Sequence, residues 1–219
     1  MSIFSLVIIA AAVLLLPLLL VFEKQERTPA ILAVKTPLSL LFILAALSQP
    51  GASGSYFGLL LAGLCLCLGG DVLLAIPGRR SFLSGLVSFL TGHLFYVIAF
   101  FAIAGLNRIL WVGAVAVLAV STLVFRWLRP HLGTMTLPVV FYIVVISGML
   151  IGALAVAGED GLSAAFRCQV LAGAICFYVS DLFVARHRFI KHEPFNRFAG
   201  LPLYYTGQFL LAFSVGLVG

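Results

Sequence analysis

Residues 56–76 read YFGLLLAGLCLCLGGDVLLAI, an apolar run interrupted by one charged residue, Asp71. A transmembrane helix takes roughly 20 predominantly apolar residues, so this run predicts a helix that crosses a bilayer. A charged side chain at the centre of such a helix costs about 3 kcal/mol or more and usually serves a function. Asp71 is therefore the first candidate functional residue, and the same kind of run recurs along the chain.

The composition of the whole chain excludes a soluble domain. Of 219 residues, 63% are hydrophobic and 9% are charged, and the mean hydropathy is +1.22. Soluble domains carry about 25% charged residues, and disordered chains need a polarity that this sequence lacks. We expect one integral membrane domain over residues 1–219, an all-α polytopic bundle of about eight transmembrane helices.

Eight apolar runs can be marked, and short turns rich in Gly, Pro, Ser or acidic residues separate them. They cover residues 3–22, 30–48, 56–76, 82–104, 109–128, 137–157, 166–185 and 199–218. The longest polar stretch covers residues 186–198. A cleaved signal peptide is the alternative for the first run. Its positive charges follow the apolar residues and no cleavage pattern precedes Glu23, so we interpret it as a helix of the bundle.

The basic residues are distributed unevenly between alternate turns of a chain whose formal net charge is +6. Turns two, four and six, with their flanks, carry only Arg108 and Arg167. The other turns carry ten: Lys24, Arg27, Arg79, Arg80, Arg126, Arg129, Arg186, Arg188, Lys191 and Arg197. Because cytoplasmic loops are enriched in Lys and Arg, we predict that these turns face the cytoplasm. Both termini then face the other side, which is the periplasm for a bacterial inner membrane.

The two halves of the chain resemble each other in the order of their polar motifs. The pairs are Lys35-Thr36-Pro37 with Thr136-Leu137-Pro138, Asp71 with Asp181, and Thr91-Gly92-His93 with Thr206-Gly207-Gln208. Runs 3–22 and 109–128 are both almost free of polar residues, which suits lipid-facing positions. This order favours a tandem duplication with halves 1–107 and 108–219, inserted in the same orientation as in some transporters. Convergence of similar apolar helices is the alternative.

Three charged residues remain inside the apolar runs: Lys35, Asp71 and Asp181. At a rise of 1.5 Å per residue, each lies about 6–8 Å from the predicted cytoplasmic end of its helix. Lys35 alone can extend to the interface, and Lys35 with one aspartate can be a structural ion pair. A structural pair needs only one carboxylate, so the second aspartate favours a functional site.

Helical spacing groups further polar side chains with these charges. His93 and Tyr96 lie three residues apart, and Tyr204 and Tyr205 lie four and three residues before Gln208, so each group shares one helix face. His93 and Gln208 lie deeper than the aspartates, at roughly 14–16 Å. Alone, His93 is an ordinary buried histidine and the tyrosines are interface aromatics. Together with the charges, these residues predict one polar site in the cytoplasmic half of the bundle.

Two carboxylates in a medium of low dielectric constant have a specific chemical use. If they lie close together, only one can be ionised, which provides a general acid and a general base in one pocket. Acid–base hydrolysis of a lipid bond near the headgroup suits their depth. The sequence contains no G-x-S-x-G, H-E-x-x-H or phosphate-binding glycine motif. The basic residues that follow Asp181 set topology, attract anionic lipid, and can also hold the phosphate of a lysolipid.

The four cysteines and the other three histidines show no spacing typical of a metal site or a disulfide framework. Cys65, Cys67, Cys168 and Cys176 lie in or beside apolar runs and are interpreted as small buried hydrophobes. Histidines 131, 187 and 192 lack metal-ligand spacing and are interpreted as solvated loop residues. We expect no metal site, no cofactor and no nucleic-acid partner.

The ordered set of motifs resembles the YhhN/TMEM86 family of integral membrane proteins over essentially the whole chain. No single motif is specific, whereas their order over eight apolar runs is. The motif at Lys35 departs from the family's Lys-Pro by the insertion of Thr36. The matching pieces are Lys35-Thr36-Pro37, Gly70-Asp71-Val72-Leu73-Leu74, Gly92-His93-Leu94-Phe95-Tyr96, Ser180-Asp181-Leu182-Phe183-Val184-Ala185 and Leu203-Tyr204-Tyr205-Thr206-Gly207-Gln208.

The resemblance implies lysoplasmalogenase activity, the hydrolysis of the vinyl ether bond of a lysoplasmalogen. The products are a fatty aldehyde and glycerophosphoethanolamine or glycerophosphocholine, and the lysophospholipid substrate is reached from the bilayer. It implies Asp71 and Asp181 as catalytic residues, with the assignment of acid and base open. The substrate-binding candidates are Lys35, His93, Tyr96, Tyr204, Tyr205 and Gln208.

A proton-coupled transporter of lipids or small molecules is the competing class. Proton relays also use intramembrane Asp, Lys and His side chains. A transporter needs polar groups that reach both faces of the membrane, whereas the outer halves of these runs are nearly free of ionisable residues. That distribution favours a site open to the cytoplasm on one side. A structural or regulatory membrane protein explains the runs but not the two aspartates.

Overall fold

The computed structural model describes residues 2–50 and 52–218, and within them every regular element is a helix. This confirms the predicted all-α class. The eight α-helices are α1 (Ile3–Lys24), α2 (Thr28–Leu47), α3 (Gly54–Ala75), α4 (Arg79–Phe101), α5 (Arg108–Leu132), α6 (Thr136–Ala157), α7 (Ala164–Ala185) and α8 (Pro194–Ser214). Short helical turns follow α5, α7 and α8, at Gly133–Met135, Arg186–Ile190 and Val215–Leu217.

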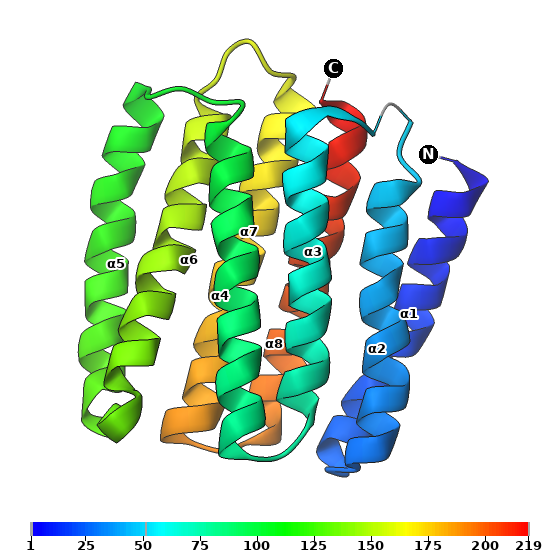
Figure 1. Ribbon diagram of the computed structural model, residues 1–219, viewed down its shortest axis with the longest axis vertical. Helices are drawn as coiled ribbons and strands as arrows, with labels where there is room; N and C mark the ends of the chain where they lie inside the picture. The colour runs from blue at the N-terminus through cyan, green and yellow to red at the C-terminus, as the bar shows by residue number, and fades with distance from the viewer. Residues whose placement is uncertain (1, 51, 219) are drawn as a thin grey trace.

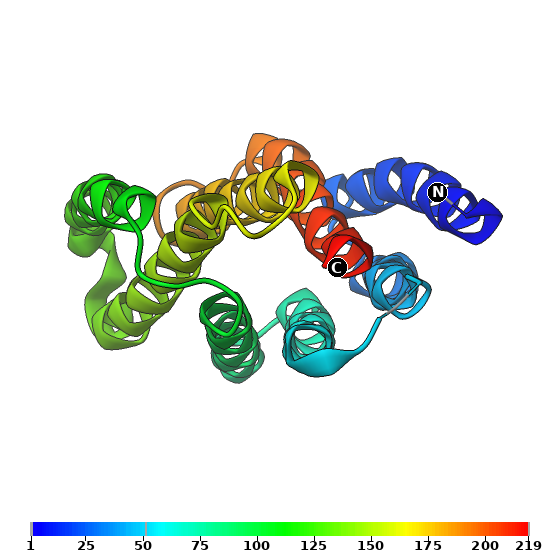
Figure 2. The same cartoon turned by 90° about the horizontal axis from the view of Figure 1, so that it is seen from above.

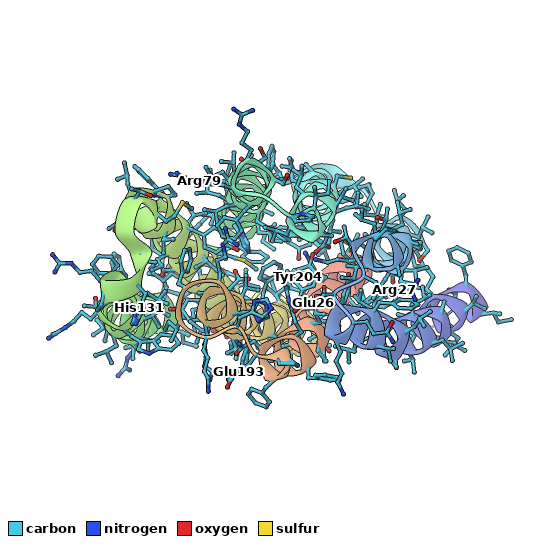
Figure 3. The ribbon with its side chains drawn as sticks, turned by 90° about the horizontal axis from the view of Figure 1, so that it is seen from below. Glu26, Arg27, Arg79, His131, Glu193 and Tyr204 are labelled. Atoms are coloured by element: carbon cyan, nitrogen blue, oxygen red, sulfur yellow. The ribbon has the colours of Figure 1, made fainter. Side chains whose placement is uncertain are left out.

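The helices run up and down in one elongated bundle (Figure 1). Seen from above, α1 and α5 occupy the two far ends, and α8 packs near the middle against α7, α1, α2 and α3 (Figure 2). The start of α1 and the end of α8 lie at the same end of the bundle. The turns that carry most basic residues lie at the opposite end, where Figure 3 labels Arg27 and Arg79. The uneven charge along the sequence is therefore a charge difference between the two ends.

Six helical stretches among the described residues are long and apolar enough to cross a membrane. One of them, Arg108–Ala157, contains both α5 and α6, and α8 is not among them. Helix α8 carries Tyr204, Tyr205 and Gln208 on a largely buried surface, which lowers its hydropathy although it lies within the bundle. Integral membrane character is confirmed, whereas the number of eight crossings stays a prediction.

The polar stretch 186–198 departs most from the expected boundaries. Instead of a long loop, Arg186–Ile190 forms a π-helical turn that continues α7, and α8 begins at Pro194. Proline fits the first turn of a helix because its missing N–H would have no partner there. Glu193 lies 2.5 Å from Lys191 and 2.8 Å from Arg186, and hydrogen bonds from these two side chains hold the pKa of this half-buried carboxyl below its usual range.

The two end helices expose apolar side chains along most of their length, as expected for lipid-facing positions. Helix α5 nevertheless contributes one buried polar residue that the sequence did not suggest. Ser121 lies 2.6 Å from the Ser147 hydroxyl on α6 and 2.8 Å from the Tyr178 hydroxyl on α7. This cluster ties α5 to the rest of the bundle through hydrogen bonds as well as apolar contact.

Two pairs of helices approach each other through facing glycines. A Cβ built on Gly92 of α4 would lie 3.0 Å from the Gly63 carbonyl oxygen of α3, and one on Gly207 of α8 would lie 2.8 Å from that of Gly173 on α7. In each half, the glycine on α3 or α7 precedes its aspartate by eight residues, at Asp71 and at Asp181. The tandem duplication stays a proposal, and these matched contacts support it.

We predict that Gly207→Ala destabilises the bundle by about 1–3 kcal/mol, because the added methyl group meets backbone atoms that cannot move aside. The matched control is Gly58→Ala on exposed α3 surface, where nothing lies within 4 Å of the new Cβ. That control gains up to about 1 kcal/mol of helix propensity. Thermal unfolding of the purified variants in one detergent measures both effects. Equal midpoints for the two variants would contradict the close α7–α8 contact.

Candidate active site

A buried carboxylate, Asp71, is the centre of the site. Its Oδ1 lies 3.1 Å from the Lys35 Nζ, and its Oδ2 accepts hydrogen bonds of 2.6 Å from the hydroxyls of Ser39 and Tyr204. Asp71 and Lys35 are 1% and 4% exposed. A buried charge is tolerated only when it is paired and hydrogen-bonded. This geometry is therefore that of an ionised carboxylate neutralised by one cation and two hydroxyl donors.

Three helices supply these groups, and simple local rules place them. Lys35 and Ser39 lie four residues apart on α2, so both face α3. Asp71 follows Gly70, where a Cβ would lie 2.5 Å from the Phe89 ring of α4, so the missing side chain lets α3 and α4 pack closely. Tyr204 comes from α8. The ion pair and its hydroxyl donors thus join α2, α3 and α8.

A hydrogen-bonded chain extends from Asp71 into the core. The Tyr96 hydroxyl donates to Gln208 Oε1 at 2.9 Å, and Gln208 Nε2 donates to the Tyr204 oxygen at 3.2 Å. The Tyr205 hydroxyl lies 3.1 Å from that of Ser39, whose only proton is donated to Asp71. Five of the six predicted substrate-binding residues therefore belong to one network around Asp71, namely Lys35, Tyr96, Tyr204, Tyr205 and Gln208.

The second predicted catalytic residue, Asp181 on α7, has a different environment. Its Oδ2 accepts a hydrogen bond of 2.5 Å from the Tyr142 hydroxyl on α6. Among the residues that the structure describes, no Lys, Arg or His forms an ion pair with it. Asp181 is only partly buried, whereas Asp71 is fully buried. The two carboxylates thus differ in charge neutralisation and in exposure.

Both aspartates line one cavity of about 100 Å³ inside the bundle. Lys35, Tyr142 and Tyr204, which contact the aspartates, are among its other polar residues. Much of the remaining wall is apolar and comes from five helices, and it includes Leu74, Leu86, Phe89, Val124, Leu128, Val139, Ile143, Ile146 and Leu182. The arrangement suits a ligand with a hydrocarbon chain and one polar bond beside the carboxylates.

Four predicted substrate-binding residues lie behind the wall of this cavity. Within the described part of the chain, its lining does not include His93, Tyr96, Tyr205 or Gln208, all of which are buried. His93 Nδ1 lies 2.6 Å from the Phe89 carbonyl oxygen, while its Nε2 is buried without a hydrogen-bond partner. Its ring contacts Phe177 and Tyr142 with centroid distances of 4.5 and 5.5 Å. Of the six predicted substrate-binding residues, only Lys35 and Tyr204 can contact a ligand in this cavity directly.

Sequence reasoning missed several residues of the site. Ser39 could have been found, because it lies one helical turn from Lys35. Tyr142 was visible as a polar residue in run 137–157, but only the fold shows that it faces Asp181. Arg188 and Arg197 were not missed, since they belong to the basic cluster that the sequence indicated for a lysolipid phosphate, and both line the cavity. No group of three or more His, Cys, Asp or Glu side chains in residues 2–50 and 52–218 is arranged to hold a metal ion.

We predict that Lys35→Met destabilises the protein by about 3–5 kcal/mol, because it leaves the Asp71 carboxylate buried without its cation. Combining Lys35→Met with Asp71→Asn removes both charges and is expected to recover most of that loss. Lys24→Met, at the exposed end of α1, is the control and should change little. Thermal unfolding in detergent compares the wild type with these three variants. If Lys35→Met is as stable as Lys24→Met, the buried ion pair is not the anchor described here.

Comparison with known proteins places the chain in a family. Residues 30–215 match the model of the YhhN family. The chain is 31% identical to bovine "Lysoplasmalogenase TMEM86A" over 183 residues, which are 80% of this chain and 72% of the relative. The human protein of the same name is 32% identical over the same shares. A "Lysoplasmalogenase" of Mycobacterium tuberculosis is 34% identical over 182 residues, 80% of this chain and 64% of the relative.

The comparison with solved structures found no match. The family assignment therefore depends on sequence. The family match covers residues 30–215, which include every residue that lines the cavity. The chain belongs to the YhhN family of integral membrane proteins.

Proposed function

We propose that this protein is a lysoplasmalogenase, a membrane-embedded hydrolase of the vinyl ether bond of lysoplasmalogens. Its products are a fatty aldehyde and glycerophosphoethanolamine or glycerophosphocholine. Relatives of more than 30% identity carry the name lysoplasmalogenase. The observation that carries the proposal is the pair of carboxylates in one largely apolar cavity, one with a cation and one without.

Asp181 is the general acid of the proposed reaction. A partly buried carboxylate without a cation is more stable in its neutral form. Tyr142 occupies one carboxyl oxygen of Asp181, and this leaves the other oxygen to carry a proton toward the cavity. Protonation of a vinyl ether at carbon is acid-catalysed and needs no nucleophilic side chain, so a neutral carboxylic acid in an apolar pocket suits the first step.

Asp71 is the ionised partner. Its three donors stabilise the charged form. A fixed negative charge beside the substrate lowers the energy of a cation that forms during the reaction. Lys35 neutralises this charge in the resting site, and Tyr204 fixes its orientation. These unequal partners support the proposed roles of the two aspartates, which the sequence alone leaves open.

The steps balance with water as the only co-substrate. Asp181 gives its proton to the vinyl carbon distant from oxygen, and the double-bond electrons form that C–H bond, leaving an oxocarbenium ion. Water adds to the oxocarbenium carbon and returns a proton to Asp181, forming a hemiacetal. Asp181 then protonates the glycerol oxygen, the C–O bond breaks, and the proton of the hemiacetal hydroxyl passes to the Asp181 carboxylate, which restores the acid as aldehyde and alcohol separate.

The residues behind the cavity wall are proposed to position these groups. Tyr96 and Gln208 hold the Tyr204 hydroxyl, and Tyr205 holds Ser39, so the donors of Asp71 have little freedom. His93 supports the Tyr142 ring that orients Asp181. Preorganised donors cost no reorganisation when charge develops, which is how such residues contribute without touching substrate.

The proposal includes the placement of the protein in the membrane. The end of the bundle with the basic turns faces the cytoplasm of a bacterial inner membrane, and both termini face the periplasm. The aspartates then lie nearer the cytoplasmic surface. The charge distribution along the sequence supports this orientation.

We expect Asp181→Asn to reduce aldehyde release from a lysoplasmalogen by about a hundredfold or more, the usual contribution of a general acid. The assay includes the alkyl-ether and acyl lysolipids, which lack the vinyl ether and should yield no aldehyde. Asp160→Asn is the control, since this exposed residue pairs with Arg167 at the other end of the bundle. Normal turnover by Asp181→Asn, with an unchanged melting midpoint, would contradict the role of Asp181.

Solvent deuterium tests the protonation step directly. In D₂O, we expect the aldehyde carbon next to the carbonyl to gain one deuterium, because the Asp181 proton exchanges with solvent before it is transferred. Mass spectrometry of aldehyde trapped at once as a stable derivative measures this label. Aldehyde incubated in D₂O without enzyme controls for later exchange. Unlabelled product would exclude acid-catalysed addition to the vinyl carbon.

A further inference from the structure

A second, larger cavity of about 690 Å³ lies at the end of the bundle that carries the basic turns. Its wall comes from the turn after α1, the end of α3, the π-helical turn after α7 and the start of α8. Glu26 and Tyr204, which border the second and the first cavity respectively, both lie near the centre of the view in Figure 3. Lys35, the partner of Asp71, lines both cavities, so the second cavity reaches the aspartate site from this end of the bundle.

The two cavities adjoin, because seven residues line both of them. Three of the seven are cationic and the other four are apolar. The shared residues are Lys35, Arg188, Arg197, Leu74, Phe82, Val184 and Phe189. A ligand that spans this junction would place an anionic group among three cations while its apolar part enters the catalytic cavity.

The basic cluster after Asp181 divides into two groups in the structure. Arg186 and Lys191 are neutralised by Glu193. Arg188 is exposed, lies over the Phe82 ring at 4.3 Å, and forms no ion pair with a carboxylate among the described residues. The cation left without a carboxylate is thus one that lines the junction.

Arg197 gives a second, independent indication of an anion-binding site at the junction. Its Nε lies 3.3 Å from Glu23 Oε2, but this nitrogen is buried and has no hydrogen bond. Guanidinium groups bind phosphate strongly through several N–H donors in one plane. The half-buried Arg197, with one buried N–H donor unused, and Arg188, which has no carboxylate partner among the described residues, both line the junction, and together they have the character of an anion site.

We propose that Arg188 and Arg197 bind the phosphodiester of the lysophospholipid at the junction of the two cavities. This inference rests on the proposed function. In a lysoplasmalogen, only the short glycerol backbone separates the vinyl ether from the phosphate, so the phosphate must lie close to the carboxylates. The hydrocarbon chain then occupies the apolar cavity, and the headgroup occupies the larger, polar one. Glycerophosphodiester and free inorganic phosphate offer the same chemistry, and the test separates them.

The test compares a lysoplasmalogen with a 1-alkenylglycerol, which has the same vinyl ether and no phosphate. For Arg188→Gln we expect the ratio of kcat/KM between the two substrates to fall about tenfold through a higher KM for the lysoplasmalogen, as for the loss of one charge-assisted hydrogen bond. Arg197→Gln should act in the same direction. Arg129→Gln, exposed on α5 at the same end and absent from the lining of both cavities, should leave the ratio unchanged.

The inference would be overturned if Arg188→Gln and Arg197→Gln both leave the kcat/KM ratio unchanged and their melting midpoints show folded protein. Aldehyde release by these variants would still support the proposed function. Competition identifies the ligand: glycerophosphoethanolamine should inhibit, and Arg188→Gln should weaken that inhibition. Equal inhibition by inorganic phosphate would overturn the headgroup assignment. If neither vinyl ether yields aldehyde, the proposed function fails. Titration calorimetry of glycerophosphoethanolamine against wild type and Arg188→Gln then decides the site by itself.

Discussion

The buried pair of Lys35 and Asp71 is the interaction on which the rest of the structure depends. It draws together α2, α3 and α8, and hydrogen bonds from Ser39 and Tyr204 complete it. In a bilayer, helices gain no hydrophobic energy by associating with one another, so close packing and polar contacts of this kind set their arrangement. The same contacts hold one carboxylate ionised in a place where an unpaired charge would be expensive.

The proposed chemistry depends on the inequality between the two aspartates. If both had a lysine, the cavity would contain two carboxylates and no acid. If neither had one, both would favour the neutral form and no fixed charge would face the substrate. The structure gives a cation to Asp71 and only a phenol to Asp181. In the proposed mechanism, a single lysine therefore separates the roles of the two aspartates.

Much of this arrangement is predictable from the sequence, because a bilayer imposes simple rules. Apolar length predicted the helices, and the scarcity of charge made Lys35, Asp71 and Asp181 conspicuous. Contacts between helices could not be predicted, since no helical period indicates that Tyr142 faces Asp181 or that Tyr204 faces Asp71. The helical start of α8 was missed because its charged residues resemble a loop. The sequence also did not indicate which basic residues are neutralised. Glu193 pairs with Arg186 and Lys191 because the turn after α7 brings these side chains together.

The glycine contacts suggest how such an unequal site can arise. Gly63 with Gly92 and Gly173 with Gly207 give the two halves the same close packing, and each half carries one aspartate. Under the proposed duplication, the ancestral site had two equivalent acids related by a pseudo-twofold axis. The second half has Thr136 where the first has Lys35. Loss of symmetry at that one position would have turned a duplicated scaffold into a directional catalyst, with a defined order in which protons move.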